Sequence, residues 1–248
     1  MDGLYLLHLM LFSLLGASLS SWMIYEFDNH GRSYASTYER FFARSKCDHC
    51  HAEIKLIHLF PVFSYIYLAG KTSCCQQKLS GKYLSFELLG TLLFIFGFTT
   101  GYIDLSFLGL LVVFTIFVDE RYKEIPLWTN SAILFWVIFF GTEMLIINLI
   151  PALALVLILV LIYLFFLKVR NIEGIGFADI ILLFSLALYL GFPAYLYLLT
   201  IASASLLLKI ILTKKYSEQH AFGSWIMGVF ALFILFQEFY GSASLNST

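Results

Sequence analysis

The sequence is poor in charged residues, and this scarcity excludes whole classes of protein. Charged residues make up only 12% of its 248 residues. Soluble domains are about 25% charged, so the low charge argues against a chain of soluble domains. The net charge of −1 leaves no basic excess to attract nucleic acid, and we expect no nucleic-acid partner.

Basic residues are also missing from the beginning of the sequence, where none precedes Arg32. A secretory signal peptide carries positive charge ahead of its apolar core. We therefore predict that the apolar run Leu4–Ser21 is a retained membrane span and not a cleaved leader.

Long apolar runs fill most of the remaining sequence, which is 60% hydrophobic and 18% aromatic. A membrane-spanning helix needs about 20 mostly apolar residues, and these runs lack the alternation of barrel strands. The sequence predicts an all-α, polytopic membrane protein with about eight transmembrane helices and a small cytoplasmic loop domain that contains the cysteines. The predicted spans are Leu4–Tyr25, Leu84–Tyr102, Leu105–Val118, Leu127–Ile147, Ile150–Leu167, Ala178–Leu190, Ala194–Leu212 and Gly223–Phe239.

The lysines and arginines set the predicted orientation of these spans. If the loop 26–82 lies in the cytoplasm, all 15 basic residues fall on the cytoplasmic side, which agrees with the positive-inside rule. Both termini then lie outside. We divide the chain into a first span with its cysteine loop (1–82), a seven-span domain (83–240) and a polar tail (241–248). Within the loop, the apolar run Leu56–Leu68 is predicted to form a helix or a re-entrant segment on the membrane surface.

Two aspartates stand at the predicted cytoplasmic ends of spans. Asp119 closes the third span and Asp179 opens the sixth. Carboxylates at this depth usually face the interior of a bundle or a water-filled cavity. Two close carboxyl groups share a proton, so one can take a proton from water while the other donates one to a peptide carbonyl. The pair therefore predicts an aspartyl protease, although acids near helix ends are common and Asp179 alone could simply cap a helix N-terminus.

Neighbouring residues fit such a site. Pro126 follows Asp119 and is suited to the first turn of the next helix. Gly174 and Gly176 precede Asp179, and glycines permit a close approach of backbone or substrate.

These motifs resemble the prepilin peptidase family, which are aspartyl intramembrane proteases of the Gly-x-Gly-Asp type. The family has an aspartate followed seven residues later by the proline of an Ile-Pro pair, here Asp119 and Ile125-Pro126. The second aspartate motif matches Gly174–Asp179, with Ala178 in place of a glycine. Phe222-Gly223 resembles the family's Pro-Phe-Gly-Pro, with Ala221 and Ser224 in place of the prolines.

The first part of the chain also contains segments similar to the family. The resemblance therefore covers nearly the whole sequence. The similar segments are Ala17–Ser21, Arg44–Cys50, Phe60–Tyr65, Leu79–Tyr83 and Glu87.

The resemblance implies a function and a set of site residues. A family member removes the short basic leader of a type IV prepilin or pseudopilin at the cytoplasmic membrane face. Many members then methylate the new amino terminus with S-adenosylmethionine, an activity associated with the first span and the cysteine loop. The substrate could belong to a competence pseudopilus, a secretion pseudopilus or an adhesive pilus. The implied catalytic residues are Asp119 and Asp179, and the implied substrate-binding or motif residues are Pro126, Gly174, Gly176, Ala178, Phe222 and Gly223.

Proteolysis by two carboxyl groups needs no cofactor. Acids that flank the two aspartates are candidates for holding the basic leader of the substrate, namely Glu120, Glu124 and Glu173.

The four cysteines are candidate metal ligands. A cytoplasmic loop is reducing, which argues against disulfides, and two Cys-x-x-Cys pairs would suit a structural zinc ion. Cys47 and Cys50 form one such pair, but Cys74 and Cys75 are adjacent, so we expect their side chains to diverge. In the family's pattern Thr72 takes the place of the third cysteine. The alternatives are zinc on these four residues, a site completed by His49 or His51, and free thiols.

Three other functions stay open on the sequence alone. Intramembrane acids also occur in transporters and channels. The alanine before Asp179 suits a non-catalytic pilus or pseudopilus assembly factor that retains the peptidase fold. A related intramembrane protease could act on another class of substrate.

Overall fold

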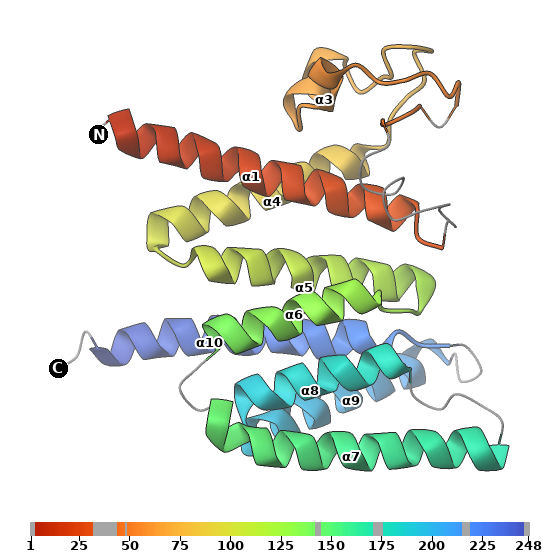
Figure 1. Ribbon diagram of the computed structural model, residues 1–248, viewed down its shortest axis with the longest axis vertical. Coiled ribbons are helices and arrows are strands. Elements are labelled where there is room, and N and C mark those ends of the chain that lie inside the picture. Colours follow the sequence, from red (N-terminus) through yellow and green to blue (C-terminus); the bar gives the residue numbers. More distant parts are fainter. Residues whose placement is uncertain are drawn as a thin grey trace. The chain divides into compact units, whose positions relative to one another are not determined.

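The computed structural model describes residues 3–31, 44–47, 49–141, 145–170, 176–214 and 219–245, and helices dominate them (Figure 1). Among the described residues, β structure is limited to two isolated β-bridges, Lys46 with Glu53 and Lys71 with Lys78. The chain forms two units, Met1–Leu110 and Leu111–Thr248. The all-α class predicted from the apolar runs is confirmed.

Eight helices of 14 or more residues occur in the described part of the chain, and each contains most of one predicted span. Of these, α1, α4, α7 and α9 are long and apolar enough to cross a membrane, while α6, α8 and Phe222–Phe236 of α10 are shorter apolar helices. The chain is therefore a polytopic helical membrane protein. The helices are α1 (Gly3–Asp28), α4 (Gly81–Thr100), α5 (Ile103–Tyr122), α6 (Leu127–Phe140), α7 (Leu145–Arg170), α8 (Phe177–Leu190), α9 (Phe192–Thr213) and α10 (Phe222–Leu245).

Two boundaries differ from the predicted spans. The fourth predicted span was too long, because α6 ends at Phe140 and the backbone N–H of Gly141 closes its last turn on Val137. The apolar residues from Leu145 onward belong instead to α7. At the other end of the chain, α10 continues to Leu245, and residues 246–248 of the predicted polar tail lie outside the described residues.

Small residues allow α1 and α4 of the first unit to pack closely side by side (Figure 1). A Cβ atom added to Gly16 would overlap the carbonyl oxygen of Gly90, and one added to Gly90 would overlap Ser20. The Ser20 hydroxyl donates back to the carbonyl of Gly16 at 2.9 Å, so it adds no unsatisfied polar group. Close backbone approach through small residues is a usual way for helices to associate in lipid.

The loop between α1 and α4 contains two short helices, η1 (Leu56–Leu59) and α3 (Phe63–Tyr67). Pro61 lies between them, and it cannot donate the backbone hydrogen bond that a continuous helix would need. Of the two predictions for the apolar run Leu56–Leu68, a single continuous helix is wrong, because the run forms two short helices with a break. Residues 32–43 of this loop lie outside the described residues.

Helix α8 is the central helix of the second unit. It packs against α6, α7 and α9, and α10 packs against α9. Gly191, with a φ of 74°, ends α8 and leads directly into α9, a conformation that favours glycine. At the other end, Gly176 precedes α8, so Asp179 lies in the first turn of a helix that has neighbours on several sides.

Candidate active site and cysteine cluster

Asp119 lies in the last turn of α5 and is only 4% exposed. Its carboxylate accepts a 2.5 Å hydrogen bond from the backbone N–H of Ser224, at the beginning of α10. The adjacent Gly223 provides the space for this approach. A Cβ atom there would lie 3.1 Å from Asp119 Oδ2 and would overlap the end of the Ile125 side chain. The Phe-Gly motif therefore packs directly on the first aspartate.

The Ser224 N–H is a contact that sequence reasoning missed. In the motif that the sequence resembles, this position is a proline, which has no N–H. The serine in this chain therefore supplies a donor to Asp119 through its departure from the pattern. The serine in place of a proline was the signal available in the sequence, and it did not indicate that Asp119 would be the hydrogen-bond partner.

Asp179 is the third residue of α8 and is partly buried. Its carboxylate accepts a hydrogen bond from the backbone N–H of Gly176, the residue before the helix. A Cβ atom on Gly176 would lie 3.1 Å from Asp179 Oδ2. Since the φ of Gly176 is an ordinary −67°, glycine is required here for space. The N-cap of α8 is Gly176 and not Asp179; the hydrogen bond that Asp179 accepts from Gly176 holds the carboxylate over the motif glycine.

The two carboxyl groups resemble each other in their surroundings, and the charge of one acts on the other. The charge of Asp179 acts on Asp119, and each carboxylate is hydrogen-bonded at the N-terminal end of a helix, α10 for Asp119 and α8 for Asp179. Helix N-termini attract negative charge. The arrangement can hold two carboxyl groups near each other with one of them ionised, which is what acid–base hydrolysis requires.

Asn130 is a second residue that the sequence analysis missed. It lies on α6 and is fully buried, and its side-chain N–H donates a 2.6 Å hydrogen bond to the carbonyl of Ala178. Asn130 Oδ1 has no hydrogen-bond partner among the residues that the structure describes. A polar residue in the apolar run Leu127–Phe140 was the available signal. Through Ala178, Asn130 fixes the backbone immediately before Asp179.

The other predicted motif residues are placed as follows. Pro126 directly precedes α6 and its carbonyl accepts from Thr129, so it begins that helix. Phe222 is the first residue of α10. Gly174 and Glu173 lie outside the described residues.

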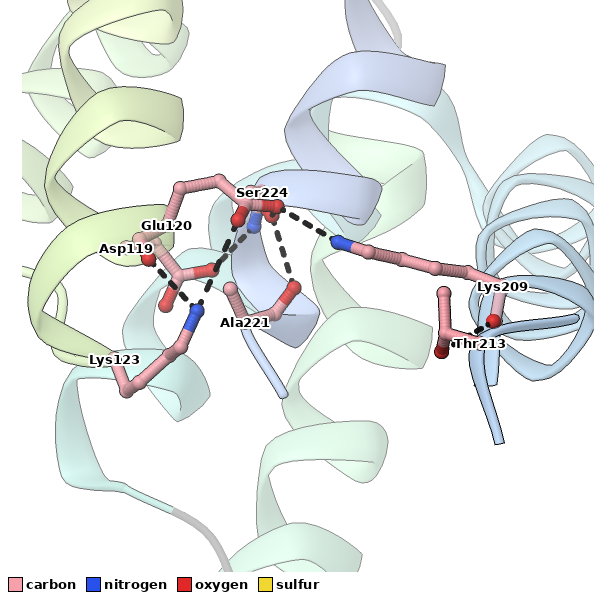
Figure 2. Close-up of polar contacts among 7 residues, drawn as sticks. All are labelled: Asp119, Glu120, Lys123, Lys209, Thr213, Ala221 and Ser224. Carbon is pink, nitrogen blue, oxygen red and sulfur yellow. Dashed lines mark hydrogen bonds and ion pairs between the residues drawn. The ribbon is translucent and has the colours of Figure 1, made fainter. Parts of the chain in front are cut away.

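The carboxylate of Glu120, next to Asp119, already bonds to other side chains of this protein (Figure 2). Its Oε1 accepts from Lys209 Nζ at 3.3 Å and from the Ser224 hydroxyl at 3.2 Å, and Lys123 Nζ lies 3.8 Å from Oε2. The two lysines balance its charge, so Glu120 ties α5 to α9 and α10 at the level of Asp119.

The four cysteines gather in the loop of the first unit. Two small hairpins carry them, one closed by the bridge between Lys46 and Glu53 and one by the bridge between Lys71 and Lys78. All four Sγ atoms lie within 4.8 Å of one another. The Sγ–Sγ distances are 3.7 Å for Cys47 and Cys75, 3.2 Å for Cys50 and Cys74, and 4.0 Å for Cys74 and Cys75.

The expectation that Cys74 and Cys75 diverge was wrong. The backbone turns sharply after them, with Gln76 at a φ of 57° and its N–H bonded to the Thr72 carbonyl. This turn brings both sulfurs to the same side. Thr72, in the position of the family's third cysteine, has its hydroxyl 3.2 Å from Cys75 Sγ. In the described part of the chain the cluster contains no histidine.

The geometry suits a tetrahedral metal ion. Zinc–sulfur bonds of about 2.3 Å place the ligand sulfurs about 3.8 Å apart, close to the separations found here. Backbone N–H groups of Cys50 and His49 lower the pKa of Cys47 to about 6, which favours the thiolate form that binds metals. The hydrogen bond with Cys50 raises the pKa of Cys74 to about 12.

Comparisons with known proteins agree with the motifs in both units. Residues 11–100 match the bacterial peptidase A24 N-terminal domain, and residues 105–213 match the type IV leader peptidase family. No solved structure matches the chain.

Curated relatives carry one name, prepilin leader peptidase/N-methyltransferase. The protein of Dickeya chrysanthemi is 30% identical over 203 residues, which cover 76% of this chain and 72% of the relative. The protein of Dichelobacter nodosus is 30% identical over 59% of this chain and 54% of its own length. That of Pectobacterium carotovorum subsp. carotovorum is 26% identical over 79% and 76%. On the match to both family domains and on these relatives, the chain belongs to the type IV leader peptidase family, the prepilin peptidases.

Proposed function

We propose that this protein is a membrane aspartyl endopeptidase that cleaves the short basic leader from type IV prepilins or pseudopilins. The proposal is supported by two observations: Asp119 and Asp179 each accept a backbone N–H at the beginning of a helix, and the charge of Asp179 acts on Asp119. The relatives' shared name supplies the substrate class.

The chemistry follows from a pair that shares one proton. The ionised carboxyl group takes a proton from water, and the resulting hydroxide attacks the scissile carbonyl carbon. The protonated carboxyl group donates to the carbonyl oxygen, and the tetrahedral intermediate collapses as the departing amine receives a proton. We assign the proton to the pair and not to one residue, because coupled carboxyl groups titrate together. No cofactor takes part in this step.

The positive-inside pattern supports an orientation with both termini outside and both aspartates at the cytoplasmic face of the inner membrane. All 15 lysines and arginines fall on one side in this arrangement. A leader that is basic and cytoplasmic would then reach Asp119 and Asp179 while the rest of the substrate helix stays in the bilayer.

We assign residues 1–82 to a second activity, N-methylation of the new amino terminus with S-adenosylmethionine as methyl donor. The relatives' name supports this assignment. Zinc held by Cys47, Cys50, Cys74 and Cys75 would stabilise the loop of this region, since structural zinc links short segments that have no core of their own. Residues 83–240 are the peptidase region, and the residues that follow continue α10 as far as Leu245.

The test is cleavage in cells that lack their own prepilin peptidase. This protein is co-expressed with a prepilin or pseudopilin, and the substrate's size and new N-terminus are determined for the wild type, Asp119→Ala and Asp179→Ala. Cleavage by the wild type and its loss in both variants are expected, because a missing acid or base costs about 10²- to 10⁴-fold. Cleavage that persists in either variant would remove that residue from the catalytic pair.

The alanine before Asp179 favours a second candidate, a non-catalytic assembly factor that retains the fold. Under that function the wild type would cleave no prepilin or pseudopilin, and Ala178→Gly would restore cleavage. A transporter and a related protease with another substrate class would also leave these substrates uncut, but neither predicts rescue by glycine.

A further inference from the structure

A short segment of the first unit presents a nearly continuous apolar surface. Between Leu56 and Tyr67, seven large apolar side chains are exposed by 40% or more. Isolated exposed apolar residues are ordinary, but a contiguous group marks a contact with another molecule or with lipid. The exposed fractions are 74% for Leu56, 71% for Ile57, 40% for Leu59, 54% for Phe60, 66% for Phe63, 65% for Ile66 and 83% for Tyr67.

Glu87 of α4 holds this segment from within a membrane helix. Its Oε2 accepts a 2.6 Å hydrogen bond from the backbone N–H of Val62, and its Oε1 accepts a 2.7 Å hydrogen bond from the Ser21 hydroxyl of α1. Glu87 is only 7% exposed. Val62 has a φ of 63°, which is unfavourable for a β-branched residue and persists only where the surroundings impose it. The segment is therefore fixed to α1 and α4.

The position of Glu87 along α4 gives the depth of the segment. Glu87 lies six residues after Gly81, where α4 begins, and a helix rises about 1.5 Å per residue. Val62 is thus held about 9 Å along the helix from its beginning. The 20 residues of α4 match the hydrocarbon thickness of a bilayer, so this depth lies inside the leaflet and not above it.

The backbone and flanking charges of the segment are compatible with such a depth. Backbone N–H groups in lipid must be satisfied within the protein. Glu87 satisfies Val62, and the N–H groups of Phe63 and Ser64 bond to the carbonyls of Pro61 and Phe60 at 2.6 and 3.0 Å. The exposed residues Lys55 and Lys71 stand on either side of the segment, where long basic side chains can reach anionic head groups.

We propose that Leu56–Tyr67 is a re-entrant segment that inserts its apolar side chains among the acyl chains of the leaflet, with Glu87 as its anchor. This inference stands on the first unit alone, independently of the proposed peptidase function.

Lipid-phase photolabelling tests the proposal on the full chain. The protein is reconstituted in vesicles of phosphatidylcholine and phosphatidylglycerol and labelled with a membrane-soluble or a water-soluble diazirine, and the sites are mapped by mass spectrometry. Phe63, Ile66 and Tyr67 should take up the membrane-soluble reagent as strongly as Leu92 of α4, which is 63% exposed. Labelling of these residues by the water-soluble reagent alone would overturn the proposal. Their subsequent protection by a prepilin transmembrane peptide would then point to the substrate helix as the occupant.

Two variants test the anchor. Glu87→Ala should lower lipid-phase labelling of Phe63 and Ile66 several-fold while labelling of Leu92 stays constant. Ser85→Ala is the matched control on α4, because its exposed hydroxyl donates to the Gly81 carbonyl of the same helix, and it should leave the pattern unchanged. If Glu87→Ala does not fold, Ile66→Asp in the intact protein should expel the segment to the water-soluble reagent. Unchanged labelling in Ile66→Asp would contradict insertion.

Discussion

The aspartate site and the cysteine cluster bring distant residues together in different ways. The aspartates are positioned by helix ends, with Asp119 at the end of α5 and its hydrogen-bond donor at the beginning of α10. The cysteines are positioned by two local hairpins that would share a metal ion. The aspartate site should therefore respond to small changes in backbone packing, whereas the cysteine cluster should respond to the loss of a ligand.

The largest expected effect belongs to the cysteine cluster. In Cys47→Ser, metal content should fall from about one zinc per chain to near zero, because a thiolate is lost from a four-ligand site. Methylation of the mature substrate should fall by a larger factor than cleavage, as measured on the same samples. Thr72→Ser, which keeps the hydroxyl near Cys75, is the control and should retain zinc. An equal loss of methylation and cleavage in Cys47→Ser would contradict the assignment of the two activities to different regions of the chain.

The packing of Gly223 on Asp119 gives the next effect. Gly223→Ala should lower cleavage about tenfold or more, since overpacking costs about 1–3 kcal/mol and the added methyl meets Ile125 and Asp119. Ser224→Ala is the matched neighbour, because it keeps the backbone N–H to Asp119. Initial cleavage rates compare the two. Equal rates in Gly223→Ala and the wild type would show that this glycine does not set the site.

Asn130 tests whether the backbone before Asp179 must be fixed. Asn130→Ala removes the side-chain hydrogen bond to the Ala178 carbonyl, which still accepts within α8, and one such hydrogen bond contributes about 0.5–1.5 kcal/mol. We expect kcat to fall about tenfold with KM unchanged, because the change displaces Asp179 and not a substrate contact. Ser131→Ala, on the exposed side of α6, is the control. A rise in KM alone would instead place Asn130 in substrate binding.

The smallest effect is expected at Lys209. Its ion pair with Glu120 is half exposed, and such pairs contribute about 0.2–1 kcal/mol. Lys209→Ala should therefore change the cleavage rate by less than about fivefold, and the difference should shrink as salt is raised. A loss as large as that in Gly223→Ala would mean that Glu120 must be neutralised for catalysis.

Apolar length and basic residues were enough to predict the helical class and the approximate position of each long helix. Hydropathy does not define where a helix stops, so the end of α6 at Phe140 required the turn at Gly141. The two aspartates could be predicted as site residues because each lies in a short motif, with Ile125-Pro126 for Asp119 and with Gly176 for Asp179.

The partners of those aspartates could not be predicted in the same way. Ser224 reaches Asp119 across 105 residues and through its backbone, which carries no side-chain signature. Asn130 contacts a carbonyl 48 residues away, and nothing in its own segment specifies that contact. Cys74 and Cys75 come together because the backbone of Gln76 adopts a left-handed conformation. No sign of this turn is present in the sequence, because the residue there is not a glycine.

The N-terminal mass of the processed substrate tests the central claim most directly. One prepilin is co-expressed with the wild type, with Asp119→Asn and with Cys47→Ser, and its N-terminal peptide is weighed. We expect a cleaved and methylated terminus with the wild type, an intact leader with Asp119→Asn, and a cleaved terminus lacking the methyl group with Cys47→Ser. A shortened terminus with Asp119→Asn would contradict the assignment of proteolysis to the aspartate pair.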